Sequence, residues 1–175
     1  MKAGSGRPQG RDDRPGFERV NKMRAVVVAP GVGRFIAVGS SGGGVTVKVS
    51  DTETDGLCTV WEGRVGPGVV GAGAHYHRER DEFFYVLAGE LVLRIGDEQH
   101  VAPAGTFAFV PRETIHGFHN ASQESASILV VHHPAGFERF LEEMQQLAAR
   151  HGSTEDREAL ATRFDMIPVP VSRAE

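Results

Sequence analysis

Two histidines one residue apart, His75 and His77, and a glutamate five positions later, Glu82, are the residues whose types and spacing best indicate chemistry. Alternate side chains of an extended chain share a face, so the two histidines point to one side and Tyr76 to the other. Glu82 starts the next apolar run, where an antiparallel hairpin would return its carboxylate to the imidazoles. His116 follows another apolar run and a proline turn, so a neighbouring strand can add a third imidazole. These four residues are the predicted ligand set.

Three neutral imidazoles and one carboxylate suit one divalent transition metal ion per chain, such as Fe, Mn, Ni, Cu or Zn, whereas calcium sites use oxygen ligands. On a six-coordinate ion, four protein ligands leave about two positions for water, substrate or dioxygen. One carboxylate leaves a net charge near +1, which favours an enolate, phenolate or carboxylate. The alternative is that these histidines lie on the surface or in the core, because a His-x-His pair alone is a weak signal.

The same alternation predicts the walls of a pocket beside the ligands, and the alternative for each of these side chains is ordinary core packing. The predicted pocket residues are Phe84, Val86 and Phe118, and also His132, because one of His132 and His133 at the end of their strand must face inward. His119 and Asp81 are predicted to point away from the site.

Short β-branched and apolar runs, separated by turns rich in Gly and Pro, supply the strands that must position these residues. They recur at spacings of roughly 8 to 12 residues, with no comparably strong helix pattern among them. The predicted architecture is all-β, an antiparallel sandwich or closed barrel. The predicted strands lie at about 24–29, 34–39, 45–49, 57–65, 74–77, 82–89, 90–96, 99–102, 106–110, 116–120 and 127–133.

After Pro134 the apolar period changes to that of an amphipathic helix at 137–148, and a second short helix is predicted from residue 153, carrying Leu160 and Phe164. Residues 1–22 are rich in Gly, Pro, Arg and Asp and have little to bury, so a disordered or loosely attached extension is expected there. The predicted organisation is therefore this extension, a barrel at 23–135 and a helical tail at 136–175 packed on the barrel.

The spacing of these residues resembles the two sequence motifs of the cupin superfamily. His75, His77, Glu82 and Gly89 match the first motif, except that the Pro-Gly pair at 67 and 68 stands one place early. The second motif lacks its middle glycine, where Glu113 stands instead, at a turn where glycine relaxes the backbone. The residues that match the second motif are Gly105, Pro111, His116 and Asn120.

This resemblance implies an antiparallel double-stranded β-helix, a jelly-roll barrel, followed by C-terminal α-helices. The segment at 134–143 with its predicted helix resembles the tail of small single-domain bacterial cupins related to quercetin dioxygenases. A metal-dependent dioxygenase acting on an aromatic, polyphenol or polyketide-like enol is therefore expected, with Glu82 as ligand and as acceptor of the substrate proton. The alternatives are a Lewis-acid cyclase, isomerase or decarboxylase, and a small-molecule-binding cupin without catalysis, because one fold serves many functions.

The formal net charge of -4 gives no basic field for nucleic acid or an anionic membrane, so a small molecule is the expected partner. No apolar run reaches the roughly 20 residues of a membrane span, and the N-terminus lacks the apolar core of a signal peptide. A cytoplasmic location is expected. The single Cys58 excludes an internal disulfide. A homodimer is expected, with the edge strand at 24–38 covered by the partner.

Overall fold

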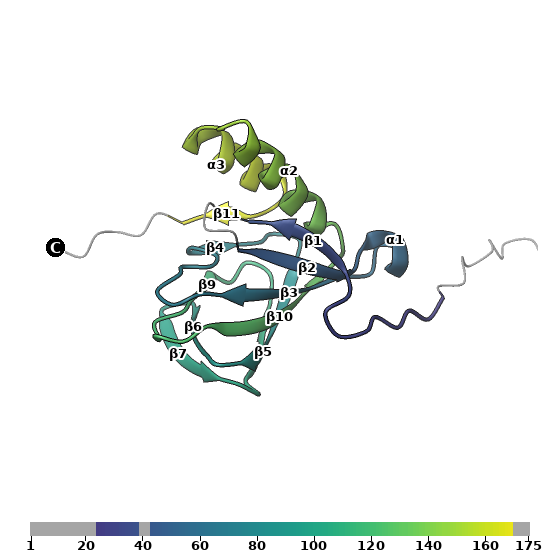
Figure 1. Cartoon of the computed structure of the whole chain (residues 1–175). Helices are drawn as coiled ribbons and strands as arrows, with labels where there is room; N and C mark the ends of the chain where they lie inside the picture. The colour runs from purple at the N-terminus through teal and green to yellow at the C-terminus, as the bar shows by residue number, and fades with distance from the viewer. Residues whose placement is uncertain (1–23, 39–42, 170–175) are drawn as a thin grey trace, which may run out of the picture.

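Two antiparallel sheets form the body of the molecule in a computed structural model that describes residues 24–38 and 43–169 (Figure 1). The prediction for 1–22 therefore lies outside the described residues. The six-stranded sheet has the order β1-β2-β3-β10-β5-β8, and the five-stranded sheet has the order β11-β4-β9-β6-β7. The strands are β1 (Arg34–Ala37), β2 (Gly44–Val49), β3 (Thr59–Val65), β4 (His75–Tyr76), β5 (Asp81–Ala88), β6 (Glu90–Ile95), β7 (Glu98–Pro103), β8 (Phe107–Val110), β9 (His116–His119), β10 (Ala126–His133) and β11 (Ile167–Pro168).

The inner faces of both sheets build the core. On β10 every second side chain is buried, and this strand lies between β3 and β5 in the middle of its sheet. From the other sheet, Leu91 and Leu93 of β6 are at most 1% exposed. Alternating burial on both sheets confirms the all-β prediction, with the jelly-roll architecture of a double-stranded β-helix.

The predicted strand at 24–29 is wrong. These residues form no strand in the described part of the chain, and Val27 is 96% exposed. β-Branched residues favour a strand only where a neighbour supplies hydrogen bonds and buries one face, and the first strand to find such a neighbour is β1, which pairs with β2. A short helix that the sequence analysis did not predict, α1 (Asp51–Thr54), follows β2 and starts with a capping box of Ser50 and Glu53.

The C-terminal region contains both predicted helices, α2 (Phe137–Ala149) and α3 (Thr154–Arg163), which lie side by side beyond the sheets (Figure 1). Ser153 and Asp156 form the capping box that starts α3. The chain then returns to the barrel as β11, which no sequence pattern predicted, and pairs with β4 so that Pro168 lies opposite His75. No helix in the described part of the chain is long and apolar enough to cross a membrane.

Candidate metal centre

Four side chains from both sheets meet in the interior: His75 of β4, His77 just after it, Glu82 of β5 and His116 of β9. β4 and β9 belong to the five-stranded sheet and pair His75 directly with His116, whereas β5 belongs to the six-stranded sheet. One ligand atom from each residue lies within 4.8 Å of the others, and each residue is at most 4% exposed. We refer to these residues as the four candidate ligands.

Backbone carbonyl oxygens fix the orientation of all three imidazoles. Because a carbonyl oxygen only accepts hydrogen bonds, each Nδ1 must be the donor, and each neutral ring therefore carries its lone pair on Nε2. The three hydrogen bonds are His75 Nδ1 to the Gly73 oxygen at 2.7 Å, His77 Nδ1 to the Asp165 oxygen at 2.6 Å, and His116 Nδ1 to the Thr114 oxygen at 2.8 Å. Such outer partners are typical of histidines that bind a metal.

The Nε2 atoms of two of these rings face the same carboxylate oxygen. Glu82 Oε2 lies 2.7 Å from His116 Nε2 and 3.2 Å from His77 Nε2. Burial would raise the pKa of Glu82, but the imidazoles of His132, His116 and His77 around the carboxylate outweigh burial and hold the pKa well below the ordinary value. The carboxylate is therefore ionised, and a cation must separate it from the facing lone pairs.

A proton or a metal ion can serve as that cation. Burial lowers the pKa of His116, but the hydrogen bond and charge of Glu82 outweigh this and raise the pKa above its ordinary value, so a proton shared with Glu82 balances the metal-free site. Burial, and then the charge of His116, lower the pKa of His75 to about 4, so that ring is neutral near neutral pH. A divalent ion would use all four donors at once and displace the shared proton, so the donor set fits the predicted metal.

Two of the four predicted pocket residues, Phe84 and His132, lie close to candidate ligands, and Phe118 packs against Phe84. The Phe84 ring centroid is 6.0 Å from that of His116 and 5.9 Å from that of Phe118. His132 is fully buried, and its Nε2 lies 3.6 Å from Glu82 Oε1. Val86 lies one inward position beyond Phe84 and is fully buried in the hydrophobic core.

The C-terminal region contributes residues that the sequence analysis did not assign to the site. Phe137, the first residue of α2, stacks on His132 with 3.8 Å between ring centroids and lies 6.0 Å from the His77 ring. Asp165 accepts the His77 hydrogen bond at its carbonyl, and its carboxylate accepts the backbone N–H groups of Arg78 and Glu79 at 2.8 and 2.9 Å. The segment after α3 therefore holds the loop between the ligands, although it lies more than 80 residues away in the chain.

The turn before His116 forms although glycine is absent from it. Glu113 has φ of 67°, the left-handed conformation that glycine adopts at low cost. Its backbone N–H donates to the His77 carbonyl oxygen at 2.6 Å, which ties this turn to the other ligand loop. Asn120, which ends the second motif, donates its side-chain amide to the Val65 and Glu124 carbonyl oxygens and so acts in the turn after β9.

The cupin domain family model matches residues 61–132, the segment that carries both motifs and all four candidate ligands. Residues 61–132 are thus similar to a cupin domain, and the two antiparallel sheets have the arrangement that is typical of a double-stranded β-helix. A search of curated proteins found no match to this chain.

Solved structures with the same fold come from several bacteria. KdgF from Halomonas sp. is 16% identical, with a TM-score of 0.57, over 66% of this chain and 99% of its own. The polyketide cyclase RemF from Streptomyces resistomycificus is 22% identical, with a TM-score of 0.54, over 63% and 80%. A predicted oxalate decarboxylase from Thermotoga maritima is 20% identical, with a TM-score of 0.51, over 53% and 80%. At these identities the likeness establishes the fold alone.

Proposed function

We propose that this chain is a mononuclear metal-dependent enzyme in which His75, His77, Glu82 and His116 hold one divalent transition ion such as Fe, Mn, Ni, Cu or Zn. The observation that carries this proposal is the buried convergence of three imidazoles and one ionised carboxylate, with the Nε2 atoms of His77 and His116 on the same Glu82 oxygen. The ion would supply Lewis acidity, and redox activity if it is Fe, Mn, Ni or Cu, at a site that favours an anionic oxygen ligand.

The reaction we propose is dioxygenation of an aromatic, polyphenol or polyketide-like enol. Glu82 supports this role because His77 and His116 both lie on its Oε2, which leaves Oε1 to accept the proton that such a substrate loses on binding. Phe84 and Phe118 give the interior beside the ligands an aromatic wall, which suits a flat apolar ring. Glu82 is thus the proposed catalytic residue as well as a ligand.

A second candidate is Lewis-acid catalysis without dioxygen, namely cyclisation, isomerisation or decarboxylation of a similar substrate. It uses the same ligands and the same proton acceptor, and RemF, which shares the fold, is named as a polyketide cyclase. The third candidate is a cupin that binds a small molecule and turns nothing over.

Elemental analysis of protein purified without oxygen, followed by oxygen electrode measurements with a flavonol, separates these candidates. A dioxygenase would contain about one redox-active ion per chain and consume oxygen with the flavonol. A Lewis-acid enzyme would convert an enol substrate under nitrogen, and a binding protein would convert nothing. His77→Ala should abolish metal loading and turnover while the circular dichroism spectrum stays unchanged, because one imidazole is a small part of the core.

His100→Ala is the matched control, because His100 is an exposed histidine on β7, outside the site. It should keep the metal content and the turnover of the unmodified protein. Absence of any bound transition ion in metal-replete protein would contradict the proposed function as a whole.

We also propose a homodimer, to which the exposed N-terminal segment would contribute. β1 is an edge strand of the six-stranded sheet, and its Phe35 is 61% exposed. An unpaired edge with an exposed aromatic side chain is a surface that a second chain could cover. Sedimentation equilibrium should give twice the chain mass, and a monomer mass at micromolar concentrations would contradict this proposal.

A further inference from the structure

Arg80 lies in the connection from β4 to β5, two residues before Glu82. Its guanidinium carbon is 5.6 Å from the centroid of the Phe137 ring. The same ring stacks on His132 and lies edge-on to His77. The Arg80 guanidinium therefore contacts the same Phe137 ring as the candidate ligand His77 and the buried His132.

Two of the three nitrogens of the Arg80 guanidinium, Nε and Nη1, are buried and make no hydrogen bond to the described residues, although the residue as a whole is partly exposed. Burial lowers the pKa of Arg80, which the carboxylates of Asp165 and Glu82 oppose. Arginine nevertheless stays charged in proteins, so a full positive charge with unused N–H groups lies beside the candidate metal centre.

Three of the four carboxylates whose charge acts on Arg80 face other groups, and the fourth, Glu79, is exposed to solvent. Asp165 uses both side-chain oxygens on backbone N–H groups of the ligand loop. Glu82 faces the site imidazoles. Glu138 is 2% exposed and accepts hydrogen bonds from the Thr59 hydroxyl and from the backbone N–H groups of Asp51 and Gly136.

Two further buried side chains near Phe137 also have unused polar atoms. Both ring nitrogens of His132 and the Trp61 Nε1 have no hydrogen-bond partner among the described residues. The His132 ring lies between those of Phe137 and Trp61, with centroid distances of 3.8 and 6.2 Å. Native proteins rarely leave buried polar atoms unpaired, and several in one place next to a reactive centre indicate a site for a polar ligand.

We propose that Arg80 binds a carboxylate group of the substrate, so that the substrate is held at two points, by the metal through one oxygen and by Arg80 through a separate anionic group. The planar guanidinium matches the geometry of a carboxylate. The ion with Glu82 carries a net charge near +1 and Arg80 adds another, so a dianion is favoured over a monoanion. This assignment rests on the proposed metal site.

Cobalt-loaded full-length protein tests the assignment, since cobalt(II) absorption reports what binds the ion. Fumarate and crotonate are suitable probes because they share one shape and differ only in that crotonate has a methyl group in place of the second carboxylate. The trans double bond of fumarate prevents both carboxylates from binding one ion. Fumarate should bind at least about tenfold more tightly than crotonate, which corresponds to one charge-assisted hydrogen bond.

Arg80→Gln should reduce this preference to less than about twofold, with crotonate and azide bound as in the unmodified protein. Arg78→Gln is the matched control, since Arg78 is an exposed arginine in the same loop, and the preference should remain. Arg80→Lys, which keeps the charge but not the planar fork, should give an intermediate preference.

Equal affinities for fumarate and crotonate in the unmodified protein would overturn the assignment without any variant, even if Arg80→Gln fails to fold. An equal loss of preference in the Arg80→Gln and Arg78→Gln variants would overturn it too, because net charge would then explain the effect. If azide binds the cobalt in these cases, the metal site stands and only the Arg80 assignment is wrong. If the protein takes up no cobalt, the proposed function and this inference are both wrong.

Discussion

The inner and outer faces of β5 place two neighbouring carboxylates, Glu82 and Asp81, in opposite environments. Glu82 is 4% exposed and lies among the imidazoles. Asp81 accepts hydrogen bonds from the side chain and the backbone N–H of Arg112 at 2.8 to 3.1 Å, and these hydrogen bonds lower its pKa to about 2. Both carboxylates are ionised near neutral pH, but among the described residues only Glu82 belongs to a cluster of three or more possible metal ligands. Because side chains alternate along the strand, Glu82 lies in the site and the adjacent Asp81 lies on the outer surface.

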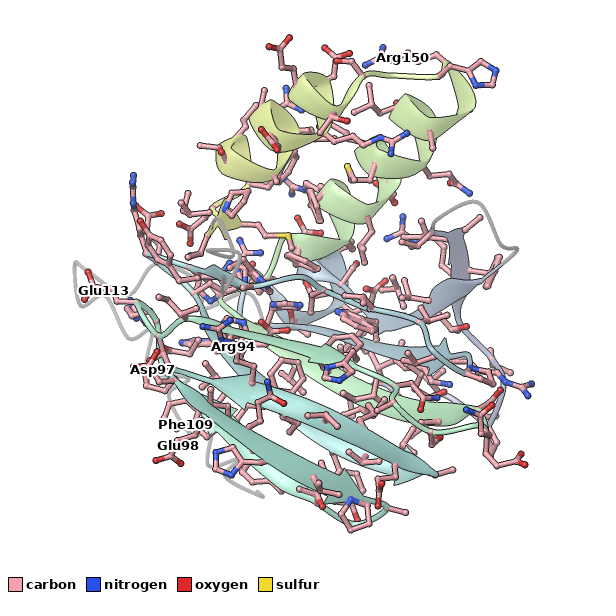
Figure 2. The ribbon with its side chains drawn as sticks, turned by 90° about the vertical axis from the view of Figure 1, so that its left-hand side faces the viewer. Arg94, Asp97, Glu98, Phe109, Glu113 and Arg150 are labelled. Carbon is pink, nitrogen blue, oxygen red and sulfur yellow. The ribbon has the colours of Figure 1, made fainter. Side chains whose placement is uncertain are left out.

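Hydrophobicity does not distinguish these two faces. Phe84 on the inner face is 1% exposed, whereas Tyr85 on the outer face is 41% exposed. The outer face continues onto β8, where Phe107 and Phe109 are 61% and 50% exposed. Figure 2 shows Phe109 at the periphery of the molecule, far from Arg150 in the helical region. The inner face is therefore defined by what its residues contact rather than by their type.

The largest expected difference between the faces is in folding stability. Phe84→Ala removes a ring that is packed against Phe118 and His116, so the free energy of unfolding should fall by about 3–5 kcal/mol. Tyr85→Ala should cost less than about 1 kcal/mol, because that ring is largely in solvent. Urea unfolding of metal-free protein measures both values. Similar losses for the two variants would mean that the outer face is buried in solution, as a dimer interface would require.

Metal affinity provides the next test. Glu82→Gln removes the charge that faces His77 and His116, and the affinity for zinc should fall by about a hundredfold or more, since even outer partners of metal ligands contribute 10- to 100-fold. Asp81→Asn makes the same chemical change one residue earlier on the outer face and should change the affinity by less than about threefold, since the charge there is paired with Arg112 and points away from the imidazoles. Competition with a chromophoric chelator gives both constants. Equal effects would contradict the assignment of Glu82 as a ligand.

Most of the site could be predicted from strand parity, the alternation of side chains between the two faces of a strand. The spacing of His75, His77 and Glu82 determines which side chains share a face, and alternation holds wherever the strand is regular. His116 could be included because the strand before it ends in a proline turn. Parity also placed Phe84 inward and required one of His132 and His133 to face inward, and in the structure Phe84 and His132 are the buried residues.

What could not be predicted depends on contacts between distant segments. Asp165 and Phe137 approach the ligand loop only because α2 and α3 fold back and β11 pairs with β4, and neither residue has a local pattern that indicates a partner. The same reason explains why the strand predicted at 24–29 is wrong: these strand-forming residues have no neighbouring strand in the described part of the chain. Glu113 shows that a left-handed turn can form without its usual glycine when a hydrogen bond to His77 holds it.

The smallest expected effect concerns His132 on the inner face of β10. Burial lowers its pKa to about 3, although the charge of Glu82 opposes this. Above the ordinary pKa of 6.5 neither the folded nor the unfolded chain protonates this ring. Below that pH the unfolded chain takes up a proton that the folded chain does not until about pH 3. The free energy of unfolding should therefore fall with decreasing pH, by up to about 1.4 kcal/mol per pH unit from this residue.

His132→Phe should remove this contribution, because a phenyl ring can stack between Trp61 and Phe137 and has no unpaired nitrogen. The variant and the unmodified protein should be similarly stable at pH 8, and the variant more stable at pH 5. Urea unfolding of the metal-free proteins at the two pH values measures the difference, with His100→Phe on the exposed side of β7 as the matched control. Parallel pH curves would mean that the buried imidazole is protonated in the folded state. If the stabilised variant also loses turnover, the unpaired nitrogens of His132 serve function at the expense of stability.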